Sequence, residues 1–190
     1  IHIFEPRYRL MLSQCAEMQP CCGVVLTRSG SEVGDQPGTF DIGTSAMNVE
    51  HVMLPDGRSN LLVKGARRYQ ILGSDWEQSY MVATIRWLDS PGHADSGPVS
   101  PDHVDQIRVL LARYLDAYNR ATGQMATFRE FDDEPTSFAY AVAATVPMPL
   151  EVRQMLLEAT PPDQLLSRLG DALRHETALL TQTGASAYLP

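Results

Sequence analysis

The sequence predicts an α+β protein in which strands come first and helices follow. Over residues 1–90, after one early helix, apolar side chains recur mainly at every second position, as in half-buried strands. Over residues 101–184 they recur every three or four positions, as in amphipathic helices. The segment 91–100 is rich in Pro, Gly and Ser, which is typical of a linker. We therefore expect a β unit, a linker and a helical bundle with these boundaries.

The β unit is expected to open with a short helix. Pro6 suits a first helical position, and the apolar side chains on one face of the helix are Tyr8, Met11, Leu12 and Cys15. Strands are expected over residues 23–27, 47–53, 61–71 and 80–88. Pro55, Asp56 and Gly57 supply a turn, because Pro fixes φ and Gly tolerates a positive φ. Gly65 allows a bulge, and Gly73 begins a second turn.

The helical part is divided by its prolines and glycines. A long helix is expected to begin after Ser100 and to end near Gly123. Shorter helices are expected over residues 135–145 and 149–159. The last helix should start at Thr160 with Pro161 in its first position. Its buried stripe is expected to consist of Leu166, Leu169, Leu173 and Leu180.

Charge and hydropathy exclude several classes of function. Fifteen Lys and Arg stand against 23 Asp and Glu, so the formal net charge is -8 and neither nucleic acid nor an anionic membrane should attract the whole protein. The longest apolar stretch, residues 138–150, contains two prolines and falls short of the ~20 residues of a membrane-spanning helix. The three cysteines match neither a zinc site nor a disulfide framework, so we expect free thiols and a cytoplasmic location.

Motifs of common enzyme classes are missing from the sequence. No phosphate-binding G-x-x-x-x-G-K-[ST] loop occurs, and Lys64 is the only lysine that a Ser-Lys peptidase pair could use. Neither H-E-x-x-H nor G-x-S-x-G is present. The acidic run from Asp132 to Glu134 is best explained as a solvated loop at a helix start. We therefore expect no catalysis, no metal and no cofactor.

Eight short segments, in a consistent order and spacing, resemble the N-terminal domain of Lon proteases. They are HIFEPRYR at residues 2–9, CGVVL at 22–26, IGT at 42–44, LPDGR at 54–58, GARRYQI at 65–71, YMVA at 80–83, PLE at 149–151 and QMLLE at 154–158. Each segment is weak by itself, but together they cover nearly the whole chain. The ATPase and peptidase of a full Lon protease have no counterpart here, so the chain is most similar to the stand-alone bacterial proteins of this type.

The resemblance implies a PUA-like, six-stranded pseudo-barrel with one early helix, followed by a helical bundle. It also implies that the first strand of the barrel precedes residue 1, where the chain opens with neither Met nor a basic leader. The motif residues expected to have structural roles are Glu5, Pro6, Arg7, Tyr8, Gly43, Asp56, Gly57, Gly65 and Arg68. For Glu5, Arg7 and Arg68, an intramolecular ion pair or a helix cap is favoured over a ligand site.

In full Lon proteases this domain is associated with substrate capture, which implies a protein that binds unfolded or apolar polypeptide segments. Such binding needs exposed apolar side chains or an open strand edge. The candidate residues are Met125, Phe128 and Phe131 in one loop, and Met47, Met53, Trp76 and Tyr80 in the β unit. For each of them, burial in a core is the competing interpretation. A protease or chaperone that receives the captured chain, and weak self-association, are left open.

Two other functions compete with polypeptide binding. PUA-like barrels resemble RNA-binding modules, and clustering of Arg58, Arg67, Arg68 and Arg86 on one face would favour RNA. A small-molecule or enzymatic site in a cleft between barrel and bundle would need a deep pocket with convergent polar groups.

Overall fold

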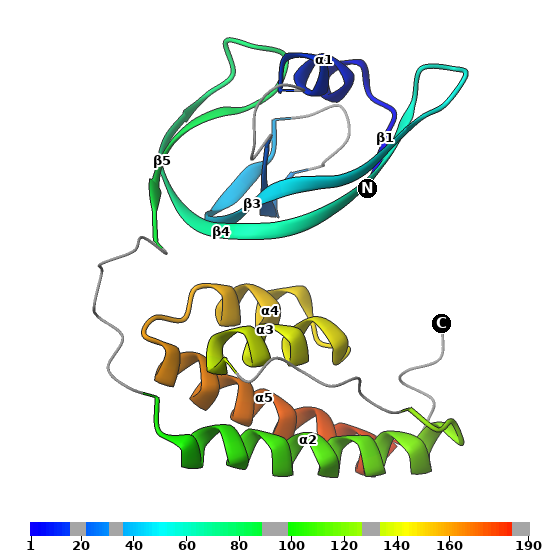
Figure 1. Cartoon of the computed structure of the whole chain (residues 1–190), viewed down its shortest axis with the longest axis vertical. Coiled ribbons are helices and arrows are strands. Elements are labelled where there is room, and N and C mark those ends of the chain that lie inside the picture. The colour runs from blue at the N-terminus through cyan, green and yellow to red at the C-terminus, as the bar shows by residue number, and fades with distance from the viewer. Residues whose placement is uncertain (16–21, 31–35, 89–98, 127–133, 184–190) are drawn as a thin grey trace. The chain divides into compact units, whose positions relative to one another are not determined.

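The computed structural model describes residues 1–15, 22–30, 36–88, 99–126 and 134–183, and contacts between Cα atoms divide the chain into two units (Figure 1). Unit 1 is Ile1–His93 and unit 2 is Ala94–Pro190. All the strands lie in unit 1 and the long helices lie in unit 2, so the α+β prediction is confirmed. The two units are described separately below.

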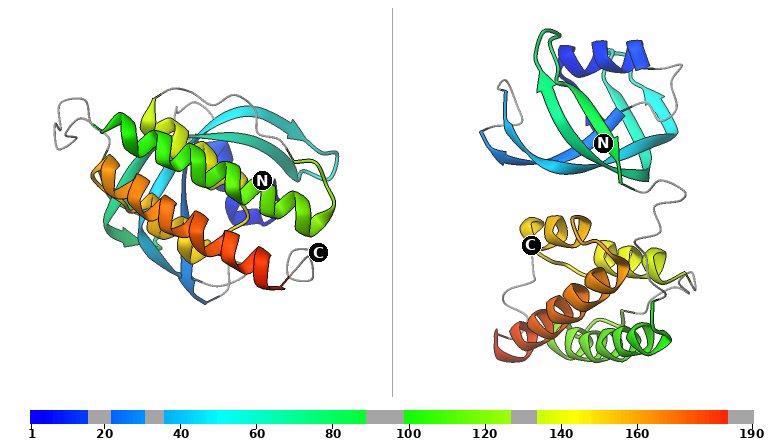
Figure 2. Two further views of the ribbon diagram at one scale, coloured as in Figure 1. Left: turned by 90° about the horizontal axis from the view of Figure 1, so that it is seen from below. Right: turned by 90° about the vertical axis from the view of Figure 1, so that its left-hand side faces the viewer.

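Unit 1 is an antiparallel sheet that curves into a barrel, with one helix across its end (Figure 1, Figure 2). Its elements are β1 (His2–Ile3), α1 (Pro6–Cys15), β2 (Cys22–Ser29), β3 (Gly38–Met53), β4 (Ser59–Asp75) and β5 (Val82–Trp87). The described strands are ordered β1-β4-β3-β2, and β5 also pairs with β4. Because β4 is long and bends, its first residues pair with β1 and its last residues pair with β5.

Two strand boundaries differ from the sequence predictions. β3 begins at Gly38, well before the predicted start at Met47, and β4 continues to Asp75 through the turn predicted at Gly73. The early part of β3 carries mostly small or polar side chains, which give no alternating apolar signal. A register shift at Gly73 lets the strand bend there without ending.

The buried ring of Tyr69 explains why small residues occupy this part of the barrel. Tyr69 is 5% exposed, and its hydroxyl donates a hydrogen bond to the Val24 carbonyl at 3.4 Å. A Cβ added to Gly43 would lie 2.6 Å from the Tyr69 Oη atom, and Gly23 faces the same ring. Burial, with a smaller contribution from Cys22, raises the pKa of the Tyr69 hydroxyl to about 12. The Tyr69 side chain is therefore uncharged, and its ring packs directly against the backbone of Gly23 and Gly43.

The HIFEPRYR segment forms β1 and the start of α1. Pro6 is the first residue of α1, and the Glu5 carbonyl accepts hydrogen bonds from the Tyr8 and Arg9 N–H groups, both at 3.1 Å. The Glu5 carboxylate forms an ion pair with the Arg7 guanidinium at 3.0 Å, and that guanidinium also lies over the Tyr8 ring. The segment thus contains the intramolecular ion pair that the sequence analysis favours.

The β3–β4 turn has the predicted chemistry. The Leu54 N–H donates to the Arg58 carbonyl at 2.8 Å, and Gly57 has a φ of 79°. Asp56 accepts hydrogen bonds from the Arg58 N–H at 3.0 Å and from its Nε at 2.7 Å, which together hold the pKa of Asp56 below its usual value. A Cβ on Gly57 would clash with the Arg9 guanidinium, so the turn contacts α1.

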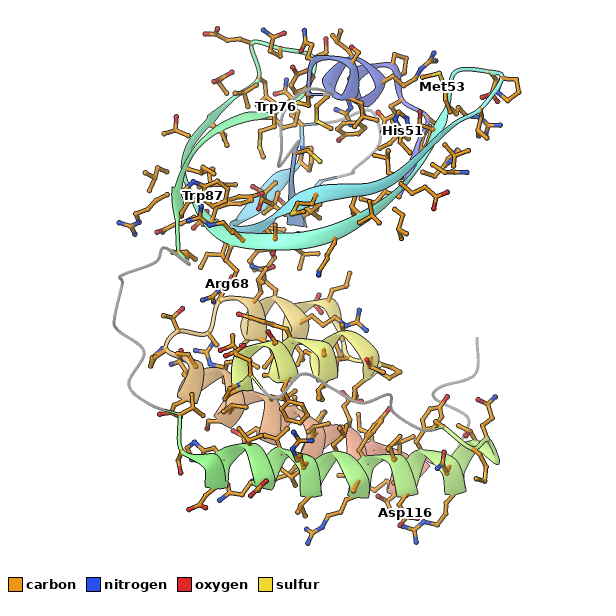
Figure 3. All side chains as sticks on the ribbon, in the orientation of Figure 1. His51, Met53, Arg68, Trp76, Trp87 and Asp116 are labelled. Carbon is orange, nitrogen blue, oxygen red and sulfur yellow. The ribbon has the colours of Figure 1, made fainter. Side chains whose placement is uncertain are left out.

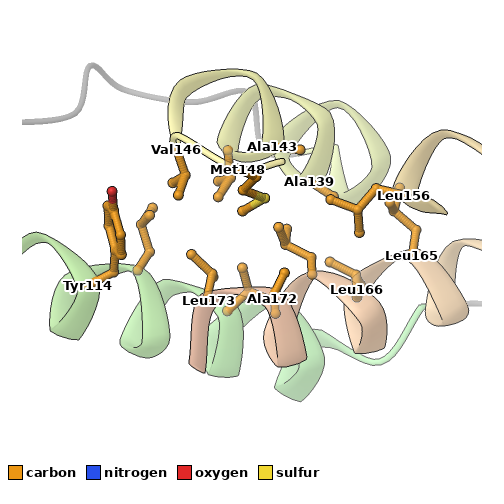
Figure 4. Close-up of a cluster of buried hydrophobic side chains, with 14 of the residues drawn as sticks. Tyr114, Ala139, Ala143, Val146, Met148, Leu156, Leu165, Leu166, Ala172 and Leu173 are labelled. Carbon is orange, nitrogen blue, oxygen red and sulfur yellow. The ribbon is translucent and has the colours of Figure 1, made fainter. Parts of the chain in front are cut away.

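Unit 2 consists of four helices around one apolar core (Figure 4). They are α2 (Pro101–Thr122), α3 (Pro135–Thr145), α4 (Leu150–Leu157) and α5 (Pro162–Thr183). The predicted leucine stripe of α5 is confirmed as core, with Leu166, Leu169, Leu173 and Leu180 all at most 3% exposed. α2 ends at Gly123, which has a φ of 68°. α5 begins at Pro162 instead of Pro161, because the Pro161 carbonyl accepts the Gln164 N–H as a cap residue does.

The N-terminus of α3 is capped by a carboxylate. The Glu134 side chain accepts hydrogen bonds from the Thr136 N–H at 3.0 Å and from the Ser137 N–H at 2.6 Å. Partial burial raises the pKa of Glu134, but these hydrogen bonds outweigh burial and hold its pKa below the usual value. The ionised form therefore stabilises the helix start.

Glu134→Gln is expected to lower the free energy of unfolding of unit 2 by about 1 kcal/mol at neutral pH. A carboxylate with a lowered native pKa contributes stability above its unfolded pKa, near 4.5, and loses it as the pH falls through the native value. The difference in free energy of unfolding between wild type and variant should therefore shrink at about pH 3. Urea unfolding followed by circular dichroism, at neutral pH and at about pH 3, measures this difference, with Glu77→Gln in unit 1 as a control. A gap of constant size would contradict the cap assignment.

Candidate functional site

The candidate residues from the sequence do not form one cluster. Met47 and Met53 lie on β3 and are 45% and 72% exposed, so interpreting them as core residues is wrong. Trp76 and Tyr80 lie between β4 and β5 and are half-buried, and the Tyr80 hydroxyl is hydrogen-bonded to Gln14 of α1. Met125 belongs to unit 2 and is 90% exposed. Phe128 and Phe131 lie outside the described residues.

Around Met47 and Met53, the β3–β4 hairpin exposes further apolar side chains that sequence reasoning missed. We call the set the hairpin patch: Met47, Val49, Val52, Met53 and Leu62, each 44–72% exposed.

The strand register explains how the patch is built. Leu62 pairs with Glu50, Val52 with Asn60 and Met47 with Lys64, which places these six side chains on the outer face of the sheet. The buried Leu61 lies on the opposite face. Val49 sits at a register shift, where β3 has one extra residue. The sequence contained one sign of an exposed apolar face, which is that both faces of the hairpin carry apolar side chains. A single core covers only one face of a hairpin, so apolar side chains on the other face remain exposed.

Charged groups border the hairpin patch without covering it. Glu50 is exposed on the outer face, and Lys64 is exposed opposite Met47. At the tip, Arg58 and Asp56 form an ion pair at 2.7 Å and so largely satisfy each other. The patch therefore combines apolar surface with one carboxylate and one ammonium group at its margins.

One serine–histidine pair lies beside the patch. His51 Nε2 and Ser59 Oγ are hydrogen-bonded at 2.9 Å across the hairpin. Ser59 is only 5% exposed, so its hydroxyl is not open to a substrate, and the pair acts as a cross-strand contact. Within the ranges that the structure describes, no three metal-ligating side chains come together, and no helix is long and apolar enough to cross a bilayer.

A second feature of unit 1 is a cavity of about 380 Å³ at the open side of the barrel. Its walls come from the N-terminal segment, α1, β2 and the β4–β5 connection. Most of the lining is apolar, including Phe4, Leu12, Val24, Leu61, Trp76 and Met81. Two of the predicted residues, Trp76 and Tyr80, thus line this cavity and not the hairpin patch.

The four arginines of the RNA alternative do not share one face. Arg58 is at the hairpin tip with Asp56, and the Arg67 guanidinium stacks over the Trp87 ring at 4.4 Å. Arg86 donates to Gln70, whereas the adjacent Trp87 contacts the buried Tyr69 ring, so Arg86 and Trp87 lie on opposite faces of β5. The remaining motif residues belong to β4: Gly65 lies against the Thr44 methyl group, and Arg68 pairs with Thr44.

Known proteins share both the sequence and the fold of this chain. Residues 1–175 match the family described as the ATP-dependent protease La (LON) substrate-binding domain. The chain is 25% identical to the Lon protease of Solibacter usitatus over 134 residues, covering 70% of this chain and 16% of that protein. It is 26% identical to the Lon protease of Escherichia coli over 155 residues, covering 77% of this chain and 19% of that protein. The chain therefore spans about a fifth or less of the length of these relatives.

Two solved structures share the fold. The Lon N-terminal domain protein from Xanthomonas campestris superposes with a TM-score of 0.61 at 18% identity, covering 89% of this chain and 85% of that one. The N-terminal domain of the Mycobacterium avium complex Lon protease gives 0.57 at 14% identity, covering 92% and 89%. The barrel and the helical bundle are thus those of Lon N-terminal domains, and with the match over residues 1–175 the chain belongs to the Lon substrate-binding domain family.

Proposed function

We propose that this protein is a non-catalytic polypeptide-binding protein that captures apolar segments of unfolded chains on its hairpin patch. The observation that carries the proposal is the exposure of Met47, Val52 and Leu62 on one face of the β3–β4 hairpin. Val49 lies at the register shift, and Met53 is exposed on the other face, opposite Ser59. Clustered exposed apolar side chains of this kind mark interaction surfaces. Methionine side chains are flexible and polarisable, which suits ligands of varied sequence.

The expected affinity is modest. Burying a few hundred Å² of apolar surface stabilises a complex by several kcal/mol at about 25 cal/mol per Å², before ordering costs are subtracted. We expect dissociation constants in the micromolar range or weaker. Such affinities permit repeated capture and release of chains.

The family description supports substrate binding and not catalysis for this part of a Lon protease. We expect neither ATP hydrolysis nor peptide hydrolysis by the purified protein, and no cofactor. Delivery of captured chains to a protease or a chaperone in the cytoplasm is part of the proposal.

Replacing Met47, Val52 and Leu62 together by Ser is expected to weaken binding of a denatured, carboxymethylated test protein at least tenfold. The melting temperature should barely change, since exposed substitutions away from packed groups shift stability by about 0.5 kcal/mol or less each. Fluorescence anisotropy of the labelled test protein measures binding. Leu72→Ser with Val82→Ser is the matched control, because these side chains are 59% and 42% exposed on the same sheet outside the patch.

Unchanged binding by the triple variant would contradict the assignment to the hairpin patch. Phe128→Ser with Phe131→Ser would then test the loop after Met125 as the binding surface. Loss of binding only after nuclease treatment would instead favour RNA as the ligand.

A further inference from the structure

Among the residues that the structure describes, one edge of the β3–β4 hairpin has no partner strand. The described part of β2 pairs with β3 as far as Ala46, which lies opposite Cys22. From Met47 to Met53, β3 pairs with β4 on one side, and in the described ranges no strand pairs with its other side. This stretch contains most of the hairpin patch.

The hydrogen bonds show which backbone groups face the open edge. In an antiparallel ladder, residue pairs that exchange hydrogen bonds alternate with pairs that do not. The Leu61 N–H donates to the Ile1 carbonyl at 2.8 Å, and the Leu61 carbonyl accepts from the Ile1 nitrogen at 2.7 Å. Both backbone groups of Leu61 therefore point away from β3. The Leu54 N–H bonds to Arg58 at the hairpin end, which fixes the same alternation.

It follows that the partners of Leu61 and Ser59, namely His51 and Met53, direct their N–H and C=O groups away from β4. Met53 is 72% exposed and His51 is also exposed, and Figure 3 labels both residues on the hairpin. His51 and Met53 together offer two N–H donors and two C=O acceptors. Because these residues are two positions apart on a strand, an extended chain alongside can pair with both.

The open edge has little of the protection that natural edge strands carry. Neither Pro nor Lys occurs from Met47 to Met53, and four of the seven residues in this stretch are apolar. Glu50 is the one carboxylate in the stretch, and it is exposed. An added strand would therefore gain most from apolar side chains at alternate positions and from a basic residue beside Glu50.

We infer that this edge binds its ligand as an added β-strand, so that the ligand class is an extended polypeptide segment with alternating apolar side chains and a flanking Lys or Arg. The inference rests on the proposed function and specifies its binding mode. Backbone hydrogen bonds from His51 and Met53 supply affinity independent of sequence, and the hairpin patch supplies the preference for apolar side chains.

A second copy of the chain is a poorer occupant of this edge. At about 3.4 Å per residue the open stretch is roughly 25 Å long, so pairing two such edges would bury roughly 500 Å² in total. Stable interfaces generally bury more than about 1,000 Å². Two copies would also bring two Glu50 carboxylates into one small interface.

The test uses an eight-residue peptide of alternating Val and Thr with a terminal Lys, and two N-methylated forms. In an added strand, alternate amides face the protein and the solvent. N-methylation of the amides that face the protein is expected to weaken binding at least tenfold. N-methylation of the amides that face the solvent is expected to weaken it less than threefold. Equal effects of the two sets would overturn strand addition.

Variants of Met53 provide the matching test on the protein. Met53→Pro removes one N–H group at the open edge without removing a bond to β4, whereas Met53→Ala removes only the side chain. We expect Pro to weaken peptide binding at least tenfold and Ala about threefold. Equal losses for the two variants, with melting temperatures both close to wild type, would overturn the inference.

The two proposals fail in different ways. If the denatured test protein binds through the hairpin patch while both methylated peptides bind equally, the added-strand mode is wrong and polypeptide binding stands. If neither the peptide nor the denatured protein binds, both proposals fail. A concentration-dependent dimer that Met53→Pro abolishes would overturn the inference in favour of a second copy.

Discussion

Replacing Leu169 by Ala is expected to lower the free energy of unfolding of the helical unit by about 2–5 kcal/mol. Leu169 is 0% exposed and belongs to the apolar core that α2, α3, α4 and α5 form. Removing its branched end leaves a cavity that rigid neighbouring helices fill only in part. α2 and α5 approach closely beside it, where a Cβ on Gly170 would lie 3.3 Å from Ile107 Cδ1.

The two units can be followed by different signals. Both tryptophans, Trp76 and Trp87, belong to unit 1, so tryptophan fluorescence reports on unit 1. Circular dichroism at the helical minimum reports mainly on unit 2, because the long helices lie there. The dichroism transition of Leu169→Ala should shift to lower urea concentration. Leu150→Ala on α4 is the control, because Leu150 is 59% exposed and its truncation should cost about 0.5 kcal/mol or less. A transition unchanged by Leu169→Ala would refute the core assignment.

In the barrel, Gly43→Ala is expected to destabilise unit 1 by about 3 kcal/mol. The new Cβ would lie 2.6 Å from both the Tyr69 Oη atom and the Val24 carbonyl oxygen. The carbonyl belongs to the β2 backbone and cannot move without disturbing the β2–β3 ladder. Tyr69 is also held in place by Trp87, whose ring it meets edge-on at 6.3 Å between centroids.

Tryptophan fluorescence during urea unfolding measures this loss, since Trp87 contacts the displaced ring. Gly73→Ala is the matched control, because nothing lies within 4 Å of a Cβ at that position. We expect the control to be neutral or slightly stabilising, as Ala restricts the unfolded chain. Similar losses for the two variants would mean that glycine flexibility, and not the close approach of Tyr69, is what the barrel requires.

The helical unit was predictable because each of its signals is local. Proline and glycine marked the ends of α2 and α3, and the leucine spacing of α5 identified the buried stripe. The early part of β3 was not predictable in this way. Gly43 is required by Tyr69, which is distant in the sequence, and no local pattern shows that requirement.

The candidate site was predicted only in part for a related reason. Alternation along β3 identifies two faces of a strand but does not tell which of them other groups cover. Met47 and Met53 were proposed from their size and flexibility, whereas Val49, Val52 and Leu62 resemble ordinary strand residues in the sequence. Their exposure depends on which strands lie beside β3, and among the described residues β2 pairs with β3 only up to Ala46.

The strand conformation of the hairpin edge has a consequence for the energetics of capture. From Met47 to Met53, β3 is paired with β4 along its length. The edge from Met47 to Met53 is therefore already extended before any ligand arrives. Since ordering a backbone costs about 1–2 kcal/mol per residue, only the incoming chain bears this entropic cost. Differences in affinity among client segments should then follow their own tendency to adopt an extended conformation.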